Sequence, residues 1–277
     1  MLWKRAVIAL TLGPLALLCV YWGDPDSFYG LLFFVPITAV ILLATYEFTN
    51  MMRKIGVSVS LWILLPAVFL LLAGAQWPEL GISGPVTIIS LLIIMTYALW
   101  LYEKQKNEHA TLSWMTMMGG LLLFGWIGSH FMLLRGIEVN AWQWTILALV
   151  STWFADSGAY LVGRFMAGKV LGRHQLSPRL SPNKTIEGYV GGIVLGTLFT
   201  IGTAFLLQIA WLPAMIIGLL ASIVSPLGDL GMSMIKRESK VKDSGHIFGE
   251  HGGAIDRVDS LLWSVAMAYY VLLFFAP

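Results

Sequence analysis

The chain has 277 residues, of which 58% are hydrophobic and 12% are charged, and its mean hydropathy is +0.79. Soluble domains contain roughly 25% charged residues, so this composition excludes an ordinary soluble protein and predicts a polytopic membrane protein. The formal net charge is only +2, and no nucleic-acid partner is expected.

Nine apolar stretches are about long enough to cross a hydrocarbon core of roughly 30 Å as helices. Lipid offers no partners for unsatisfied backbone groups, so we expect an all-α bundle of transmembrane helices without a separate soluble domain. The expected spans are residues 6–22, 28–49, 57–75, 85–102, 112–134, 141–163, 187–207, 209–228 and 258–276.

The basic residues predict the orientation of these spans. If the amino terminus is cytoplasmic, 16 of the 17 Lys and Arg residues fall on the cytoplasmic side, and only Arg135 falls outside. This distribution is what the positive-inside rule expects. The sequence therefore predicts a multi-pass protein of the cytoplasmic (inner) membrane with a cytoplasmic amino terminus.

The polar residues are concentrated in the carboxy-terminal half. The two long cytoplasmic loops, 164–186 and 229–257, both belong to this half, whereas the first five spans carry almost no charge. We therefore expect residues 1–140 to be a transmembrane scaffold that contacts membrane lipids, and residues 141–277 to be the catalytic transmembrane region.

The most highly charged stretch is residues 225–259. On a helix that continues the eighth span, intervals of four, four, three and four residues place one set of polar side chains on one face: Ser225, Asp229, Ser233, Lys236 and Lys240. Such a row suits a metal ion at one level and phosphate oxygens at the next. An interfacial helix end with snorkelling lysines is the alternative, and it is the better interpretation for Lys240. For Asp229, close to the membrane boundary, we favour a function.

The segment before the ninth span is rich in glycine. Gly252 and Gly253 precede a predicted helix, where glycines let exposed backbone N–H groups approach an anion closely. Asp256 and Asp259 share the first turns of that helix, where carboxylates are also favoured for structural reasons. Asp256 is equally suited to join Asp229 as a ligand of Mg²⁺, a cation that prefers oxygen. The spacing leaves both interpretations open.

A third polar group lies in the sixth span and the loop after it. Asp156 is an intramembrane carboxylate and so a functional-site hypothesis, although pairing with Arg164 or Lys169 near the cytoplasmic surface would also account for it. A turn that leads into a helix is also predicted here, and Thr185 would cap that helix. The pattern is Ser181-Pro182-Asn183-Lys184-Thr185. Lys184 and Arg173 are also candidates to face a triphosphate.

The segment from Ser233 to Asp259 resembles the signature of the phosphatidate cytidylyltransferase (CDP-diacylglycerol synthase) family. The one departure that we notice is Ala254, at a packing position where the family usually has a larger aliphatic residue. The matching positions are Ser233, Ile235, Lys236, Arg237, Lys242, Asp243, Gly245, Phe248, Gly249, His251, Gly252, Gly253, Asp256, Arg257, Val258 and Asp259. The resemblance is strong over residues 150–277 and rests mainly on hydropathy before them.

The resemblance implies transfer of a cytidylyl group from CTP to phosphatidate at the cytoplasmic leaflet, giving CDP-diacylglycerol and pyrophosphate. It implies that Asp229 and Asp256 bind Mg²⁺, and a second cation is also expected. We further expect a homodimer. Catalytic roles are expected for Asp229, Asp256, Lys236, Arg237, Lys242 and His251. Substrate-binding roles are expected for Ser225, Ser233, Lys184, Ser181, Asp156, Asp243, Gly252, Gly253, Arg257 and Asp259.

Three other interpretations remain. A CTP-dependent lipid kinase would share the membrane site, metal and nucleotide, but it would transfer the γ-phosphate. A transporter would use Asp156 and Asp229 as coupling-ion ligands, yet nearly every charge gathers at one side of the membrane, which argues against it. A non-catalytic scaffold would make Asp256→Asn nearly silent.

Overall fold

The computed structural model describes residues 13–23, 30–104, 109–245 and 252–275, and most of these residues are helical. The chain forms two compact units. Unit 1 comprises Met1–Leu133 and Ile235–Val258, and unit 2 comprises Leu134–Met234 and Asp259–Pro277. The segment 235–258 therefore groups with the amino-terminal half. The division into a scaffold (1–140) and a catalytic region (141–277) stays a prediction.

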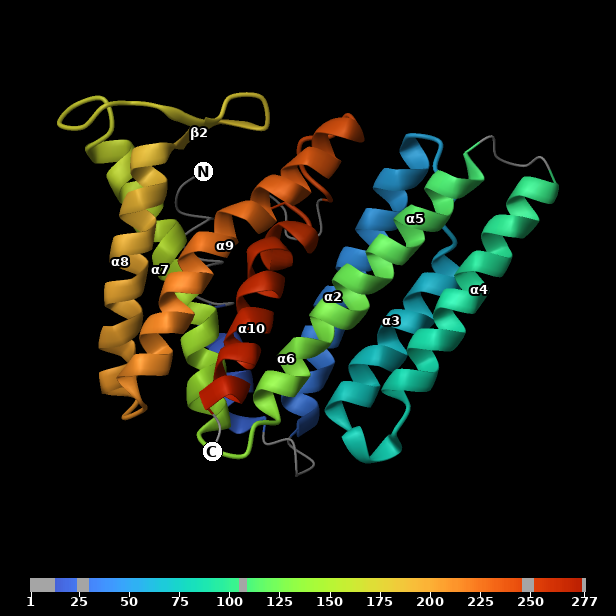
Figure 1. Ribbon diagram of the computed structural model, residues 1–277, viewed down its shortest axis with the longest axis horizontal. Helices are drawn as coiled ribbons and strands as arrows, with labels where there is room; N and C mark the ends of the chain where they lie inside the picture. Colours follow the sequence, from blue (N-terminus) through green and yellow to red (C-terminus); the bar gives the residue numbers. More distant parts are fainter. Residues whose placement is uncertain (1–12, 24–29, 105–108, 246–251, 276–277) are drawn as a thin grey trace. The chain divides into compact units, whose positions relative to one another are not determined.

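Unit 1 is built from apolar helices of the amino-terminal half, drawn in blue to green in Figure 1. Its core contains the fully buried Ile41, Leu64 and Phe124, and the rings of Phe48 and Phe124 lie 5.6 Å apart. The helices are Gly13–Trp22, α2 (Gly30–Lys54), α3 (Leu61–Gln76), η1 (Pro78–Leu80), α4 (Ser83–Glu103), α5 (Ala110–Gly120), η2 (Leu121–Ile127) and most of α6 (Gly128–Arg135).

Unit 2 contains a tightly packed helix pair, α7 (Ala141–Phe165) and α8 (Ile186–Leu206), which lie side by side in Figure 1. The buried residues of α8 are spaced by four and are all small: Gly188, Gly192, Gly196, Thr200 and Ala204. A Cβ on Gly192 would lie 2.8 Å from the backbone oxygen of Ala155. Small residues let two membrane helices approach closely, which explains this stripe.

Two further helices contribute to both units. Helix α9 (Trp211–Glu238) leaves unit 2 after Met234, and α10 (Ile255–Phe275) enters it at Asp259. The helix predicted to continue beyond the eighth span is confirmed as far as Glu238. Lys240 lies beyond the end of α9 with a positive φ of 56°. The expectation that Lys240 continues the polar face of the helix is therefore wrong.

The helices confirm a polytopic membrane protein. Among the described residues, seven helices are long and apolar enough to cross a membrane. Two of the nine expected spans appear as the shorter apolar helices Gly13–Trp22 and Leu61–Gln76. The total of nine spans and the cytoplasmic amino terminus remain predictions.

The loop 164–186 contains a β-hairpin that the sequence did not predict. Strands β1 (Gln175–Ser177) and β2 (Ser181–Thr185) pair antiparallel, with Gln175 opposite Thr185. The expected turn at 181–185 is therefore a strand, and the hairpin lies in a loop of an otherwise helical bundle. The predicted cap is confirmed, because the Thr185 hydroxyl accepts a hydrogen bond from the backbone N–H of Gly188 at 3.0 Å. The hairpin consequently leads directly into α8.

Candidate active site

A pocket of about 460 Å³ lies within unit 2, between α7, the β-hairpin, α8 and α9. This size is in the range of small-molecule binding pockets. Its lining combines small, aromatic and charged residues: Asp156, Ala159, Tyr160, Gly163, Arg164, Arg173, Leu176, Asn183, Lys184, Thr185, Gly188, Tyr189, Pro226 and Asp229. We refer to it as the unit 2 pocket.

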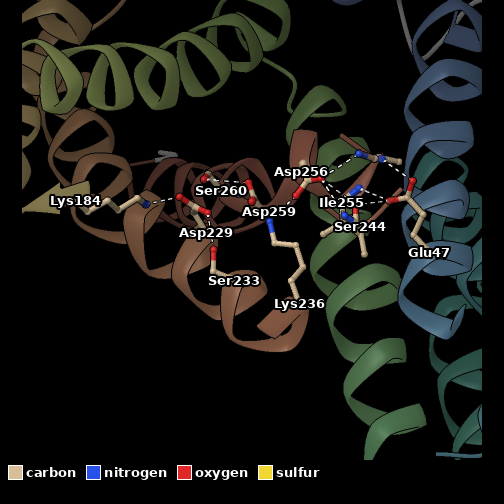
Figure 2. A network of polar contacts seen from close by, with 12 residues as sticks. Glu47, Lys184, Asp229, Ser233, Lys236, Ser244, Ile255, Asp256, Asp259 and Ser260 are labelled. Carbon is tan, nitrogen blue, oxygen red and sulfur yellow. Dashed lines mark hydrogen bonds and ion pairs between the residues drawn. The ribbon is translucent and has the colours of Figure 1, made fainter. Parts of the chain in front are cut away.

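An ion pair joins the hairpin to α9 at the wall of this pocket. The Lys184 ammonium donates to a carboxylate oxygen of Asp229, and the Ser233 hydroxyl donates to the other oxygen at 3.3 Å (Figure 2). The two charged side chains are 29% and 34% exposed. Because water reaches both groups, the pair contributes little to stability, and the lysine can exchange its carboxylate partner for an anionic ligand.

A second carboxylate enters the pocket from α7. The hydroxyl of Ser225, fully buried on α9, donates to Asp156 at 3.0 Å. Asp156 also interacts electrostatically with Lys184 and Asp229. The predicted set Asp156, Ser225, Asp229, Ser233 and Lys184 is therefore brought together within one unit.

Cations dominate the remaining charge of the pocket. Arg164 and Arg173 line it together with Lys184, opposing two carboxylates with three positive charges. Next to Arg173, His174 is fixed to the first turn of α8, because its backbone N–H and its Nδ1 both contact the Glu187 carboxylate, the latter at 2.6 Å. The structure thus holds a cationic loop against a pocket large enough for a phosphorylated ligand.

Unit 1 contains a separate polar network, also drawn in Figure 2. The Lys236 ammonium donates to Oδ1 of Asp256 at 2.5 Å, and these side chains are only 11% and 12% exposed. Oδ2 of Asp256 accepts from the backbone N–H and the hydroxyl of Ser244 and from the N–H of Gly253. Four donors therefore lie within hydrogen-bond distance of Asp256, one of which, the Ser244 hydroxyl, is shared with Glu47.

The glycine pair before α10 contacts Asp256, and its expected role toward an anionic substrate stays a prediction. Gly252 has a φ of +80°, a backbone conformation that glycine adopts without strain, and the N–H of Gly253 points at the Asp256 carboxylate. On the same helix, Asp259 is buried and accepts from the N–H and hydroxyl of Ser260.

Other residues expected to meet substrates lie on exposed or partly exposed segments. Ser181 begins strand β2 and is half-buried. The exposed group comprises Arg237, Lys242, Asp243 and Arg257. His251 lies outside the described residues. The predicted roles of these residues remain predictions.

Asp229 belongs to unit 2 and Asp256 to unit 1. Their predicted sharing of one metal ion therefore stays a prediction. Among the described residues, no group of three or more His, Cys, Asp or Glu side chains converges to hold a metal ion.

Glu47 is a buried member of this polar network for which the sequence predicted no role. It lies within the second predicted span, it is 4% exposed, and it accepts hydrogen bonds from Ser244 and from the start of α10. The available signal was an acidic side chain inside an apolar span, which is costly unless it has a specific partner.

The fold and the site define a class of protein: a helical membrane protein with a cationic pocket between helices α7, α8 and α9. The cytidylyltransferase family model matches residues 3–275, so the chain belongs to the cytidylyltransferase family.

Curated relatives support this assignment over most of the chain. The phosphatidate cytidylyltransferase of Bacillus subtilis is 32% identical over 252 residues, which cover 88% of this chain and 90% of the relative. The phosphatidate cytidylyltransferase of Synechocystis sp. is 31% identical and covers 90% of both chains. That of Staphylococcus haemolyticus is 34% identical over 66% of this chain and 68% of its own length. The resemblance found in the segment from Ser233 to Asp259 is thereby confirmed.

Proposed function

We propose that this protein is an integral-membrane phosphatidate cytidylyltransferase, which transfers the cytidylyl group of CTP to phosphatidate. The family match and the relatives support this function. The structural observation that carries it is the unit 2 pocket, in which three cationic side chains accompany two carboxylates. Such a lining suits a polyphosphate, which needs positive charge around its oxygens.

The reaction needs no covalent enzyme intermediate. A phosphate oxygen of phosphatidate attacks the α-phosphorus of CTP, and the bond from that phosphorus to the bridging oxygen of the β-phosphate breaks. The electron pair of this bond leaves with pyrophosphate. The attacking oxygen is already ionised near neutral pH, so no general base is required. The protein has to position two anions and to neutralise the charge that develops on the leaving group.

The cations of the pocket are suited to hold the triphosphate of CTP. Arg164 lies at the end of α7, Arg173 just before the hairpin, and Lys184 in strand β2. Lys184 is already oriented by Asp229, so a phosphate oxygen can accept a hydrogen bond from its ammonium group without a large rearrangement. Ser233 orients the same carboxylate from one turn away on α9.

The donor set of the pocket fits a divalent cation. Asp156 and Asp229 supply oxygen ligands within one unit. Mg²⁺ is commonly held by one or two carboxylates together with phosphates and water. When bound, Mg²⁺ would neutralise phosphate charge and stabilise the leaving pyrophosphate. We also propose that a second cation binds and that Asp256 is a metal ligand. Full activity of Asp256→Asn would contradict the role of Asp256.

The finer topology is also part of the proposal. A cytoplasmic amino terminus places 16 of 17 Lys and Arg residues on the side where CTP is found. This distribution supports nine spans in the cytoplasmic membrane, with the active site facing the cytoplasm. A homodimer is proposed from the family resemblance.

The test is a reconstituted assay with phosphatidate and CTP labelled at either the α- or the γ-phosphate. The α-label should enter the lipid product, and the γ-label should appear in pyrophosphate. Transfer of the γ-label to lipid would instead identify a kinase. Chelation of divalent cations should abolish the activity, and added Mg²⁺ should restore it. Full activity in the chelator contradicts the metal proposal.

Variants then connect the activity to the pocket. Asp229→Asn should lower kcat/KM about 100- to 1000-fold, because it removes a charge that orients Lys184 and binds the cation. Glu138→Gln makes the same chemical change at an exposed carboxylate of unit 2 and should leave the rate unchanged. Equal rates in both variants would exclude Asp229 from the reaction.

A further inference from the structure

Glu47 is a buried carboxylate on α2 that holds the start of another helix. Its Oε1 accepts from the backbone N–H of Ala254 at 3.0 Å, and its Oε2 accepts from the N–H of Ile255 at 3.1 Å. The Ser244 hydroxyl adds a third hydrogen bond to Oε2 at 2.8 Å. Figure 2 shows the Glu47 carboxylate directed at Ser244 and Ile255.

This contact satisfies backbone donors at the start of α10. The first N–H groups of a helix have no partner within the helix, and they lie at the positive end of its dipole. Ile255 is the first residue of α10, so Glu47 satisfies donors that would otherwise be unpaired. A carboxylate that is only 4% exposed requires such partners.

Two glycines show how closely the backbone is fitted around this carboxylate. A Cβ built on either Gly245 or Gly253 would collide with the Glu47 carboxylate oxygens. Neither glycine has a positive φ, so close approach rather than backbone conformation excludes a side chain. Gly245 and Gly253 therefore both lie against the same carboxylate.

The same segment positions Asp256. The Ser244 hydroxyl lies within hydrogen-bond distance of both Glu47 Oε2 and Asp256 Oδ2, the latter at 3.1 Å. Gly253, which packs on Glu47, donates its N–H to Asp256 at 3.0 Å. Displacing Glu47 therefore disturbs the donors that orient Asp256 toward Lys236.

We propose that Glu47 is a positioning residue for Asp256: through Ser244, Gly253 and the first turn of α10, it fixes the carboxylate that pairs with Lys236. We call this arrangement the Glu47 clasp; its residues are Glu47, Ser244, Gly253, Ala254, Ile255 and Asp256. Its effect on catalysis rests on the proposed function and on the predicted role of Asp256, whereas its effect on the backbone does not.

The first experiment measures hydrogen exchange of the purified full-length chain. Glu47→Gln keeps the size of the side chain but replaces one acceptor by an NH₂ donor that faces backbone N–H groups. Exchange at Ala254 and Ile255 should become about 10- to 100-fold faster, because the NH₂ group cannot accept a hydrogen bond from these backbone N–H groups. Glu103→Gln, at an exposed position on α4, is the matched control and should show no change. Equal protection of α10 in both variants overturns the clasp.

The second experiment measures the catalytic consequence. Glu47→Gln should lower kcat about 10- to 100-fold, the usual effect of losing a residue that orients a ligand or catalytic group. KM for CTP should change by less than about threefold, because the clasp includes none of the cations proposed to hold the triphosphate, which are Arg164, Arg173 and Lys184. If Glu47→Gln folds and its amides exchange faster but its kcat is unchanged, Glu47 only caps α10, and the positioning role is overturned.

A second variant keeps the proposal testable if Glu47→Gln does not fold. Gly253→Ala retains Glu47 but forces its carboxylate to move, and it should reproduce the faster exchange and the loss of kcat. Gly84→Ala is the control, because a Cβ there has no neighbour within 4 Å. Wild-type behaviour of Gly253→Ala overturns the clasp. If the wild-type protein does not act on CTP and phosphatidate, the proposed function fails, whereas the exchange data still decide the clasp.

Discussion

Two lysine–aspartate pairs, one in each unit, have the same chemistry and different surroundings. Lys184 and Asp229 in unit 2 are 29% and 34% exposed and line a pocket. Lys236 and Asp256 in unit 1 are 11% and 12% exposed, and Asp256 has three additional donors. A partly hydrated pair can change partners, whereas a desolvated and saturated pair keeps its geometry. The unit 2 pair is thus suited to bind substrate, and the unit 1 pair to hold a fixed arrangement.

The largest expected effect tests the fixed character of the unit 1 pair. Lys236→Met should destabilise the protein by about 3 kcal/mol, because it leaves a largely desolvated carboxylate without its cation. Lys184→Met should cost no more than about 1 kcal/mol, since water can replace the lysine. Denaturant unfolding in detergent measures both. Equal losses of stability would remove the distinction between the pairs.

The second effect concerns catalytic activity and tests whether the unit 2 pair binds substrate. Lys184→Met should lower kcat/KM for CTP by about 100-fold, or about 2.7 kcal/mol, because an oriented donor to the triphosphate is lost. Lys169→Met is the matched control, since Lys169 lies in the same loop but does not line the pocket. A similar fall in both variants would indicate a general effect of charge.

A smaller effect, on the KM for CTP, tests whether the triphosphate binds next to Arg173. Arg173→Gln should raise KM for CTP about 10-fold, or about 1.4 kcal/mol, because it removes one charge-assisted hydrogen bond. Steady-state kinetics over a range of CTP concentrations measures it. Arg179→Gln, an exposed change near the turn of the same hairpin, should have little effect. An unchanged KM in Arg173→Gln would place the triphosphate away from this arginine.

The smallest effect tests how the hairpin is joined to α8. Thr185→Ala should cost about 1 kcal/mol of stability, because the N–H of Gly188 loses its capping oxygen. Thr185→Ser keeps the hydroxyl and should restore most of the stability. Thermal unfolding of the two variants measures the difference. Loss of equal size in both would assign the effect to the methyl group rather than to the cap.

Local patterns were sufficient for several features. The alternation of apolar stretches with charged loops predicted the helices, because a backbone in lipid must satisfy its own hydrogen bonds. The four-residue spacing of Asp229 and Ser233 predicted that they share one face of a helix, and on α9 the Ser233 hydroxyl donates to Asp229. Thr185 was recognised as a cap from its place before Glu187. In each case the interacting groups lie within one or two helical turns.

The charged residues of the second half also identified the family before any comparison. The segment from Ser233 to Asp259 carried enough specific positions to do so, and the family model confirms it. The sequence could not show that residues 235–258 group with the amino-terminal half, because a single helix such as α9 can cross a boundary between compact units.

What remained for the tertiary structure to decide was which distant groups meet. Lys184 and Asp229 are 45 residues apart, Asp156 and Ser225 are 69 apart, and Glu47 and Ala254 are 207 apart. The sequence by itself determined the helices and the chemical types available, since both follow from local backbone and side-chain chemistry. Helix packing selected the partners, because a carboxylate removed from water must find a donor wherever the fold places one.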